Sequence, residues 1–328
     1  MIDPDMLLSE FAEQGYIVID DILDLNQDIQ PVIDDYEVLL DNLAEAWYRQ
    51  GKLKSAYSEL SFELRYVKVI TEISQSNPKW MNYFDIALDA SGVTKQTPIH
   101  LSKAVFGLIC NPKLLDIVEV FIGSEIYSNP IQHARIKPPQ RMLPDGQDIG
   151  LVGQELWHQD RGVGTDELDN TDLLTVWIPM VDATVENGCL VVVPGSHRDG
   201  LTPHCPGPAL KGGGRPVRIP NELLGSVRKP VPVKRGGIYI QHGWLKHGSL
   251  PNVSEQIRWS FDLRYQPIGQ PTGRPEFPGF VLRSQEHPEL VLNDYKKWRT
   301  LWEDARSELA TDGGPLLTRW DSDTPPGC

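Results

Sequence analysis

The chain has 328 residues, 40% hydrophobic and 23% charged, which is ordinary for a globular protein. Its formal net charge of -14 argues against general binding to nucleic acid or anionic membranes, because both require basic protein surface. No apolar run approaches the roughly 20 residues that cross a bilayer. Without a signal-peptide pattern or CxxC spacing, we expect a reduced, cytoplasmic setting and no disulfide framework.

Residues 1–123 are predicted to be mainly helical, with one strand. Apolar residues at helical spacing indicate a helix at 5–14, which Gly15 ends, and a short strand follows at 16–19. Further helical patterns cover residues 29–50, 82–88 and 101–121. We expect this part of the chain to support a β-rich core.

The pattern changes to strands after residue 123, and the core is expected at 124–266. Apolar, β-branched runs bounded by turn residues predict strands at 125–137, 173–181, 188–193, 237–241 and 256–266. The last run alternates, with apolar residues on one face and polar ones on the other. The polar face consists of Arg258, Ser260, Asp262 and Arg264. Such strands predict an antiparallel sandwich or barrel.

The rest of the chain is predicted to consist of loops and one more helix. Residues 140–153 and 198–230 are rich in turn-forming residues, and long loops of this kind are usually functional. The extension at 267–328 is expected to contain a helix at 289–309 and a loose tail. No composition break resembles a linker between domains, so the chain is predicted to be a single domain.

The segment Trp157-His158-Gln159-Asp160 has the spacing of a metal site. Residues two apart lie on one face of a β-strand, so His158 and Asp160 can offer a nitrogen and an oxygen to one ion. Two imidazoles and a carboxylate are the ligands of non-haem iron(II) oxygenases. His247 is the preferred second imidazole, and His242 is the alternative. Alone, an HxD pair is a weak signal that also fits a surface strand.

Arg258 begins the alternating strand, where its guanidinium can bind a dicarboxylate in bidentate fashion. If the guanidinium is buried, leaving it without an anion would carry a large desolvation cost. The alternative without a functional role is a surface arginine on an edge strand. The remaining histidines are expected to be structural or exposed, with His197 near the barrel mouth. They are His100, His133, His197, His204 and His287.

Three segments resemble the phytanoyl-CoA dioxygenase family of iron(II)/2-oxoglutarate-dependent oxygenases. They are WHQD at 157–160, NGCLVVVPGSH at 187–197 and HGSLPNVSEQIRWS at 247–260. Weaker similarity extends the resemblance over most of residues 10–266. The resemblance implies a mainly β fold with flanking helices around a double-stranded β-helix, a cupin-like jelly roll.

The resemblance also implies roles for individual residues. His158, Asp160 and His247 would ligate Fe(II), and Arg258 would hold the distal carboxylate of 2-oxoglutarate. The implied neighbours of that carboxylate are Ser249 as a hydroxyl partner, Trp177 in the pocket wall and Lys137 as a nearby basic residue. Ser249 as an ordinary turn residue stays open, and so does Arg135 in place of Lys137, because both basic residues lie on one strand face.

The implied reaction uses Fe(II), 2-oxoglutarate and O2, and oxidises a C–H bond of a small metabolite. Hydroxylation, with release of succinate and CO2, is the preferred outcome. Asp160 argues against halogenation, because related halogenases have a small residue at this position. Desaturation, epimerisation and ring formation or expansion stay open. The alternative of another class is a non-oxidative cupin-like isomerase or sensor, which would not need Arg258 and Ser249.

The sequence does not identify the substrate or the residues that contact it. A basic stretch within 198–235 would attract an anionic substrate if it bordered the active-site mouth, and a solvated charged loop is the alternative. Its cations are Arg198, Lys211, Arg215, Arg218, Arg228, Lys229, Lys234 and Arg235. We expect a small-molecule partner, neither nucleic acid nor membrane, and a monomer or homodimer.

Overall fold

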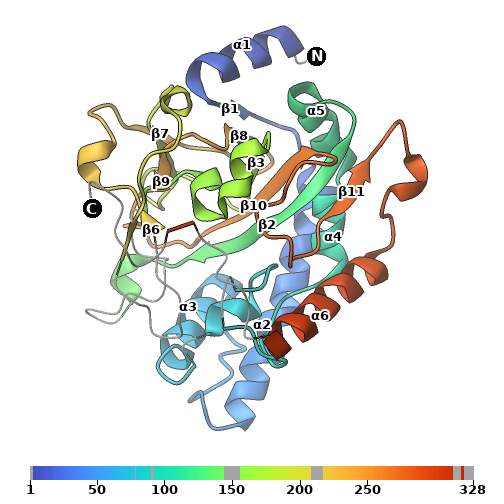
Figure 1. Cartoon of the computed structure of the whole chain (residues 1–328). Helices are drawn as coiled ribbons and strands as arrows, with labels where there is room; N and C mark the ends of the chain where they lie inside the picture. The colour runs from blue at the N-terminus through green and yellow to red at the C-terminus, as the bar shows by residue number, and fades with distance from the viewer. Residues whose placement is uncertain are drawn as a thin grey trace.

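The computed structural model describes residues 3–77, 79–89, 92–143, 156–207, 217–312 and 319–320. Two antiparallel sheets pack together, and helices cover the outer face of the larger sheet (Figure 1). The predicted mainly β fold with flanking helices and a jelly-roll core is therefore confirmed. Within the described ranges, no helix has the length and apolar character needed to span a membrane.

The larger sheet has six strands in the order β1-β8-β3-β10-β2-β11. Their bounds are Tyr16–Ile19 (β1), Ile126–Lys137 (β2), Leu174–Pro179 (β3), Ile238–His242 (β8), Arg258–Pro267 (β10) and Phe280–Arg283 (β11). The smaller sheet contains β7 (Lys229–Val231), β4 (Leu190–Val192) and β9 (His247–Ser249). The five predicted strands of the core are all present. The edge strand β11 was not predicted.

A third, two-stranded sheet lies within the region predicted as a long loop at 198–230. It pairs β5 (Cys205–Pro206) with β6 (Val217–Arg218). The part of the predicted loop 140–153 beyond residue 143 lies outside the described residues. Two described cysteines, Cys110 and Cys189, are free, whereas Cys205 is disulfide-bonded, contrary to the sequence-based expectation.

The helices begin and end where capping residues allow. The first is α1 (Pro4–Gln14). Asp3 caps its N-terminus, where the Asp3 carboxylate accepts from the Asp5 amide, and Gly15 caps its C-terminus with a left-handed φ of 78°. The others are α2 (Gln30–Arg49), α3 (Phe62–Ile73), α4 (Lys103–Ile109), α5 (Pro112–Ile122) and α6 (Tyr295–Asp312). In Figure 1, α6 runs beside α4 at the edge of the molecule.

Three helix predictions need correction. The helix expected at 82–88 is a 3-10 turn, Trp80–Tyr83, followed by irregular chain. The helix expected at 101–121 is two helices, because Asn111 caps α5 and Pro112 begins it; a proline has no amide proton to continue α4. The last helix begins at Tyr295, later than expected.

The alternation of β10 explains how the sheet separates its core from its polar face. Trp259 and Phe261 pack against Tyr36 of α2, with ring centroids 4.9 and 5.8 Å apart. Each fully buried aromatic side chain contributes about 2 kcal/mol of hydrophobic stabilisation. The opposite face carries Arg258 and its polar neighbours, and Lys137 of β2 is the register partner of Arg258. This polar face is directed toward the smaller sheet.

Candidate metal centre

His158, Asp160 and His247 bring one ligand atom each to within 4.8 Å of one another. The Nε2 atoms of His158 and His247 lie 3.7 and 3.8 Å from Oδ1 of Asp160. Their Nδ1 atoms donate to the carbonyls of Leu156 and Leu245, at 2.8 and 3.0 Å. A carbonyl only accepts, so this contact assigns the proton to Nδ1 and puts the lone pair on Nε2, the form that binds a metal ion. The side-chain nitrogen of Gln241 lies 3.1 Å from Nε2 of His247.

Backbone pairing brings the two imidazoles together. His158 and His247 form an isolated antiparallel bridge, with amide-to-carbonyl distances of 2.9 and 3.0 Å. Asp160 then begins a 3-10 turn, Asp160–Val163. The β-strand expected to carry His158 and Asp160 is therefore reduced to one bridge residue. The extended backbone of Gln159, with φ -117° and ψ 136°, links the bridge to the turn.

The Gln159 side chain fixes this short link. Its amide nitrogen donates to the carbonyls of Gly200 and Trp244 at 2.8 and 2.6 Å, and its oxygen accepts from the Thr202 amide at 2.8 Å. Its backbone amide donates to Nε2 of the buried His204 at 2.9 Å. His204 is thus a structural residue, as expected.

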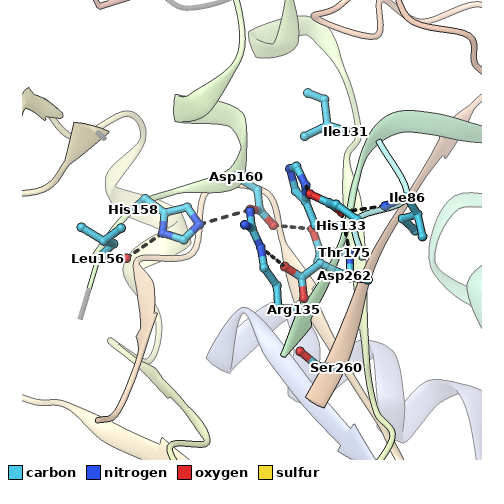
Figure 2. Close-up of polar contacts among 12 residues, drawn as sticks. Ile86, Ile131, His133, Arg135, Leu156, His158, Asp160, Thr175, Ser260 and Asp262 are labelled. Carbon is cyan, nitrogen blue, oxygen red and sulfur yellow. Dashed lines mark hydrogen bonds and ion pairs between the residues drawn. The ribbon is translucent and has the colours of Figure 1, made fainter. Parts of the chain in front are cut away.

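Asp160 is completely buried and its carboxylate is bonded on both oxygens. Oδ1 accepts from Nη2 of Arg264 at 2.5 Å, and Oδ2 accepts from Gln241 at 2.8 Å and from the Thr175 hydroxyl. Figure 2 shows Asp160 between His158 and Thr175. Burial alone would raise the pKa of Asp160, but the charge and hydrogen bond of Arg264 hold it well below its usual range. The carboxylate is therefore ionised and fixed in direction.

The two imidazoles are neutral at physiological pH. Burial, reinforced by the neighbouring His247, lowers the pKa of His158 to about 4. Burial also lowers the pKa of His247. Neutral imidazole is the form that binds metal ions. The donor set therefore combines two neutral nitrogens with one anionic oxygen, which suits Fe(II).

Arg258 lies on the same inner face, and no described residue pairs its guanidinium with a carboxylate. Its side chain is buried, Nη1 donates to the Ser260 hydroxyl at 2.6 Å, and Nε has no partner among the described residues. Burial lowers the pKa of Arg258 to about 10. Its guanidinium carbon lies 5.6 Å from the centre of the Trp177 ring. A buried guanidinium in this state is suited to receive an anion.

Lys137 and Ser249 lie beside Arg258. Nζ of Lys137 donates to the Ser249 hydroxyl at 3.1 Å and to the carbonyl of Leu250. Arg135, the alternative to Lys137, lies opposite Ser260 instead, with Nε 3.9 Å from Oδ2 of Asp262. The structure thus gathers all four residues that the resemblance assigned to the cosubstrate.

The other histidines lie outside the cluster of ligand atoms. His242 packs against His197 and Phe11, with ring centroids 5.3 and 6.2 Å apart. His100 and His133 pair with aspartates, and His287 is exposed. Among the described residues, His247 is thus the histidine that joins His158 and Asp160.

Sequence reasoning missed the partners of Asp160. Arg264 was predicted to lie on the polar face of its strand, but no feature of the sequence indicated that it would bind Asp160. Thr175 and Gln241 lie in predicted strands that gave no chemical signal. The C-terminal tail, expected to be loose, is docked at two residues: Arg319 donates to the carbonyl of Arg161 at 2.9 Å, and Trp320 to that of Gly162 at 2.6 Å.

The basic stretch within 198–235 is spread over different parts of the molecule. Lys211 and Arg215 lie outside the described residues. Arg198 donates to carbonyls at the end of α1, and Arg235 bonds Gln30. Arg228 lies beside the metal-binding segment, with its guanidinium 5.5 Å from the Trp157 ring.

Comparison with known proteins identifies related sequences and folds. Residues 11–260 match the family model described as phytanoyl-CoA dioxygenase (PhyH). A phytanoyl-CoA dioxygenase domain-containing protein 1 from Danio rerio is 35% identical over 134 residues, 39% of this chain and 44% of that protein. The 1-deoxypentalenic acid 11-beta-hydroxylase of Streptomyces exfoliatus is 34% identical over 110 residues, 32% and 39% of the two chains.

These matches span less than half of either relative's length. A solved structure of the non-heme monooxygenase ThoJ, in its apo form, aligns with a TM-score of 0.54 and 17% identity. The alignment covers 93% of this chain and 99% of that one, which shows that the two share a fold.

Proposed function

Because the chain belongs to the phytanoyl-CoA dioxygenase family, we propose that it is an Fe(II)- and 2-oxoglutarate-dependent dioxygenase acting on a small organic molecule. One observation carries this proposal. Two neutral imidazoles and an ionised carboxylate converge on the face of the sheet where a buried arginine has no carboxylate partner among the described residues.

His158, Asp160 and His247 would hold the iron. Three protein ligands leave coordination positions for 2-oxoglutarate and O2, and the bound metal would supply the oxidation chemistry. Thr175, Gln241 and Arg264 would keep the carboxylate of Asp160 directed at the ion. Such outer partners orient metal ligands in many sites.

Arg258 would bind the distal carboxylate of 2-oxoglutarate. Its planar guanidinium matches a carboxylate in geometry, and pairing would offset the cost of its burial. Lys137 and Ser249 would contribute further donors, and Trp177 would form part of the wall. This arrangement disfavours the alternative of a non-oxidative isomerase or sensor, because neither requires a dicarboxylate clamp.

Oxidation of a substrate C–H bond, most simply hydroxylation, is the proposed reaction. 2-Oxoglutarate and O2 would be converted to succinate and CO2 as the substrate gains an oxygen atom. The named activity of one relative, an 11-beta-hydroxylase, supports this choice. An intact Asp160 argues against halogenation. Desaturation, epimerisation and ring formation would use the same residues and differ only in product.

Succinate release tests the proposed function. Purified protein supplied with Fe(II), 2-oxoglutarate and O2 is expected to form succinate slowly even without substrate. His158→Ala and Asp160→Ala should abolish this activity, because each removes a metal ligand. His242→Ala is the matched control and should retain it. Succinate formation that persists in His158→Ala, or is absent from the metal-loaded wild type, would reject the proposal.

A further inference from the structure

Arg274 lies in the segment that follows β10 and folds over the loop after Asp160. The amide and hydroxyl of Thr165, in that loop, donate to the carbonyl of Gly273 at 3.4 and 3.2 Å. Asn129 of β2 donates to the carbonyl of Thr272 at 3.0 Å. The backbone of Arg274 is therefore anchored beside the metal-binding segment. Its side chain is buried, with 7% of the residue exposed.

Within the part of the chain that the structure describes, the guanidinium of Arg274 has no anionic partner. Among the described residues, no carboxylate lies within 4.0 Å of it, and its buried Nε has no hydrogen-bond acceptor. Its guanidinium carbon lies 5.6 Å from the centre of the Phe277 ring. Burial of a guanidinium without an acceptor or counter-ion destabilises the folded protein, so a structural role alone does not account for Arg274.

The acidic groups whose charge reaches Arg274 are Asp85 and Asp89, and both are already engaged. Asp85 accepts from the Ala134 amide at 2.9 Å and pairs with Nδ1 of His133 at 2.8 Å. Asp89 accepts from Asn82 at 2.7 Å and lies 3.6 Å from the ammonium of Lys79. Neither carboxylate is left over to neutralise Arg274.

The nearby cations make the position of Arg274 less favourable still. Burial, followed by the charges of Arg264 and Arg135, lowers the pKa of Arg274 to about 10. Arg264 is bonded to Asp160. Figure 2 shows Arg135 beside Asp262. Backbone contacts place Arg274 near Arg264, because Asn129, the register partner of Arg264, donates to the carbonyl of Thr272, two residues before Arg274.

The other cationic side chains near the metal centre each have an anionic partner or a proposed one. Arg264 pairs with Asp160, and Arg135 lies 3.9 Å from Asp262. Arg258 and Lys137 are assigned to 2-oxoglutarate by the proposed function. Arg274 is left over, with one positive charge facing no described anion.

We propose that Arg274 binds a carboxylate of the substrate, so that the substrate class is a small organic acid. This inference rests on the proposed function for the identity of the site. A guanidinium donates two parallel hydrogen bonds to a carboxylate, and one carboxylate supplies the single negative charge that is missing. Arg274 would select substrates by their acid group and orient them toward the metal.

Thermal stability of the substrate-free protein gives the first test. Arg274→Met keeps the length of the side chain and removes an unpaired buried charge, so the melting temperature should rise. Arg264→Met is the matched control: it removes the partner of Asp160 and should lower the melting temperature. A decrease for Arg274→Met like that for Arg264→Met would show a structural role and overturn the proposal.

Calorimetric binding of matched ligand pairs gives the second test. Aliphatic, alicyclic and aromatic monocarboxylic acids are each compared with the corresponding primary carboxamide, in the anaerobic protein with and without Fe(II) and 2-oxoglutarate. The best acids should bind the wild type about tenfold to a hundredfold more tightly than their amides. Arg274→Gln should abolish this preference, and Arg274→Lys should restore part of it.

Equal binding of acids and amides, no binding of any acid, or a preference that survives in Arg274→Gln would overturn the inference. Both tests are distinct from the test of the proposed function. A wild type that forms succinate but does not prefer acids rejects the role of Arg274 alone. Loss of succinate formation, with the acid preference intact, rejects the proposed reaction.

Discussion

Asp160 combines a metal-facing oxygen with three donors on one buried carboxylate. Thr175 and Gln241 bond one oxygen, and Arg264 bonds the oxygen that faces the imidazoles. Partners of this kind determine how rigidly a ligand is presented, and losing one typically lowers metal affinity tenfold to a hundredfold. The contribution of each donor can therefore be measured as the change in metal affinity when that donor is removed.

Thr175→Val is predicted to weaken metal binding about tenfold to a hundredfold, because it removes the hydroxyl donor without changing the side-chain shape. The measurement is a titration with Fe(II) or Mn(II) under anaerobic conditions. Thr171→Val is the matched control, since Thr171 is equally buried but donates to the carbonyl of Pro271. Equal metal affinities for the two variants would contradict the orienting role of Thr175.

The lowered pKa of buried His204 is expected to make the stability of the protein depend on pH. Its Nε2 accepts from the Gln159 amide, and burial lowers its pKa from 6.5 to about 3. The unfolded chain therefore binds a proton at a higher pH than the folded protein. The stability from neutral His204 is fully present above pH 6.5 and is lost as pH falls toward about 3.

His204→Gln should reduce the slope of unfolding free energy against pH by roughly 1.4 kcal/mol per pH unit within this window. Denaturant unfolding of wild type and variant between pH 6.5 and 4 measures the difference. Identical slopes would show that His204 is protonated or solvated in the folded state.

At the level of elements, two residues of the C-terminal segment brace the turn that contains Asp160. Arg319 donates to Asp169, to the carbonyl of Arg161 and to that of Thr165, at 2.7, 2.9 and 2.7 Å. The adjacent Trp320 ring stacks on His204 at 5.2 Å. The segment thus supports the metal-binding turn from outside.

Arg319→Ala is predicted to lower the unfolding free energy by about 1–3 kcal/mol, because it removes the side-chain donor to the carbonyl of buried Arg161 and the pair with Asp169. Hydrogen exchange in the segment 160–165 should also become faster. Arg299→Ala provides the comparison, since Arg299 forms an exposed pair with Glu303 that contributes about 0.5 kcal/mol or less. If both variants behave alike, the C-terminal segment does not stabilise the turn.

The elements that sequence predicted best are those whose burial follows a simple period. The two faces of β10 were correct, because one packs on α2 and the other is polar. The helix at 82–88 was wrong, because Asp85 in that region bonds His133 and the Ala134 amide of β2. Such long-range contacts override local helical spacing. Pro112 was missed as a boundary within an otherwise continuous apolar pattern.

For the whole molecule, the fold brings together residues that are far apart in sequence. The family resemblance predicted which residues would gather at His158 and at Arg258, and the structure brings each set together. It did not predict Arg264 as the partner of Asp160, or Arg274 as an unpaired cation. Those roles depend on which carboxylates are already engaged, which only the three-dimensional arrangement shows.

Anaerobic titration of 2-oxoglutarate into the Fe(II)-loaded protein tests most directly whether the three ligands and Arg258 form one cosubstrate site. Wild-type protein is predicted to develop a weak visible metal-to-ligand charge-transfer band. Arg258→Ala should weaken 2-oxoglutarate binding about tenfold to a hundredfold, whereas Arg198→Ala should not, because the Arg198 side chain binds a carbonyl at the end of α1. A metal-loaded wild type without the band, and binding unchanged in Arg258→Ala, would contradict the assignment.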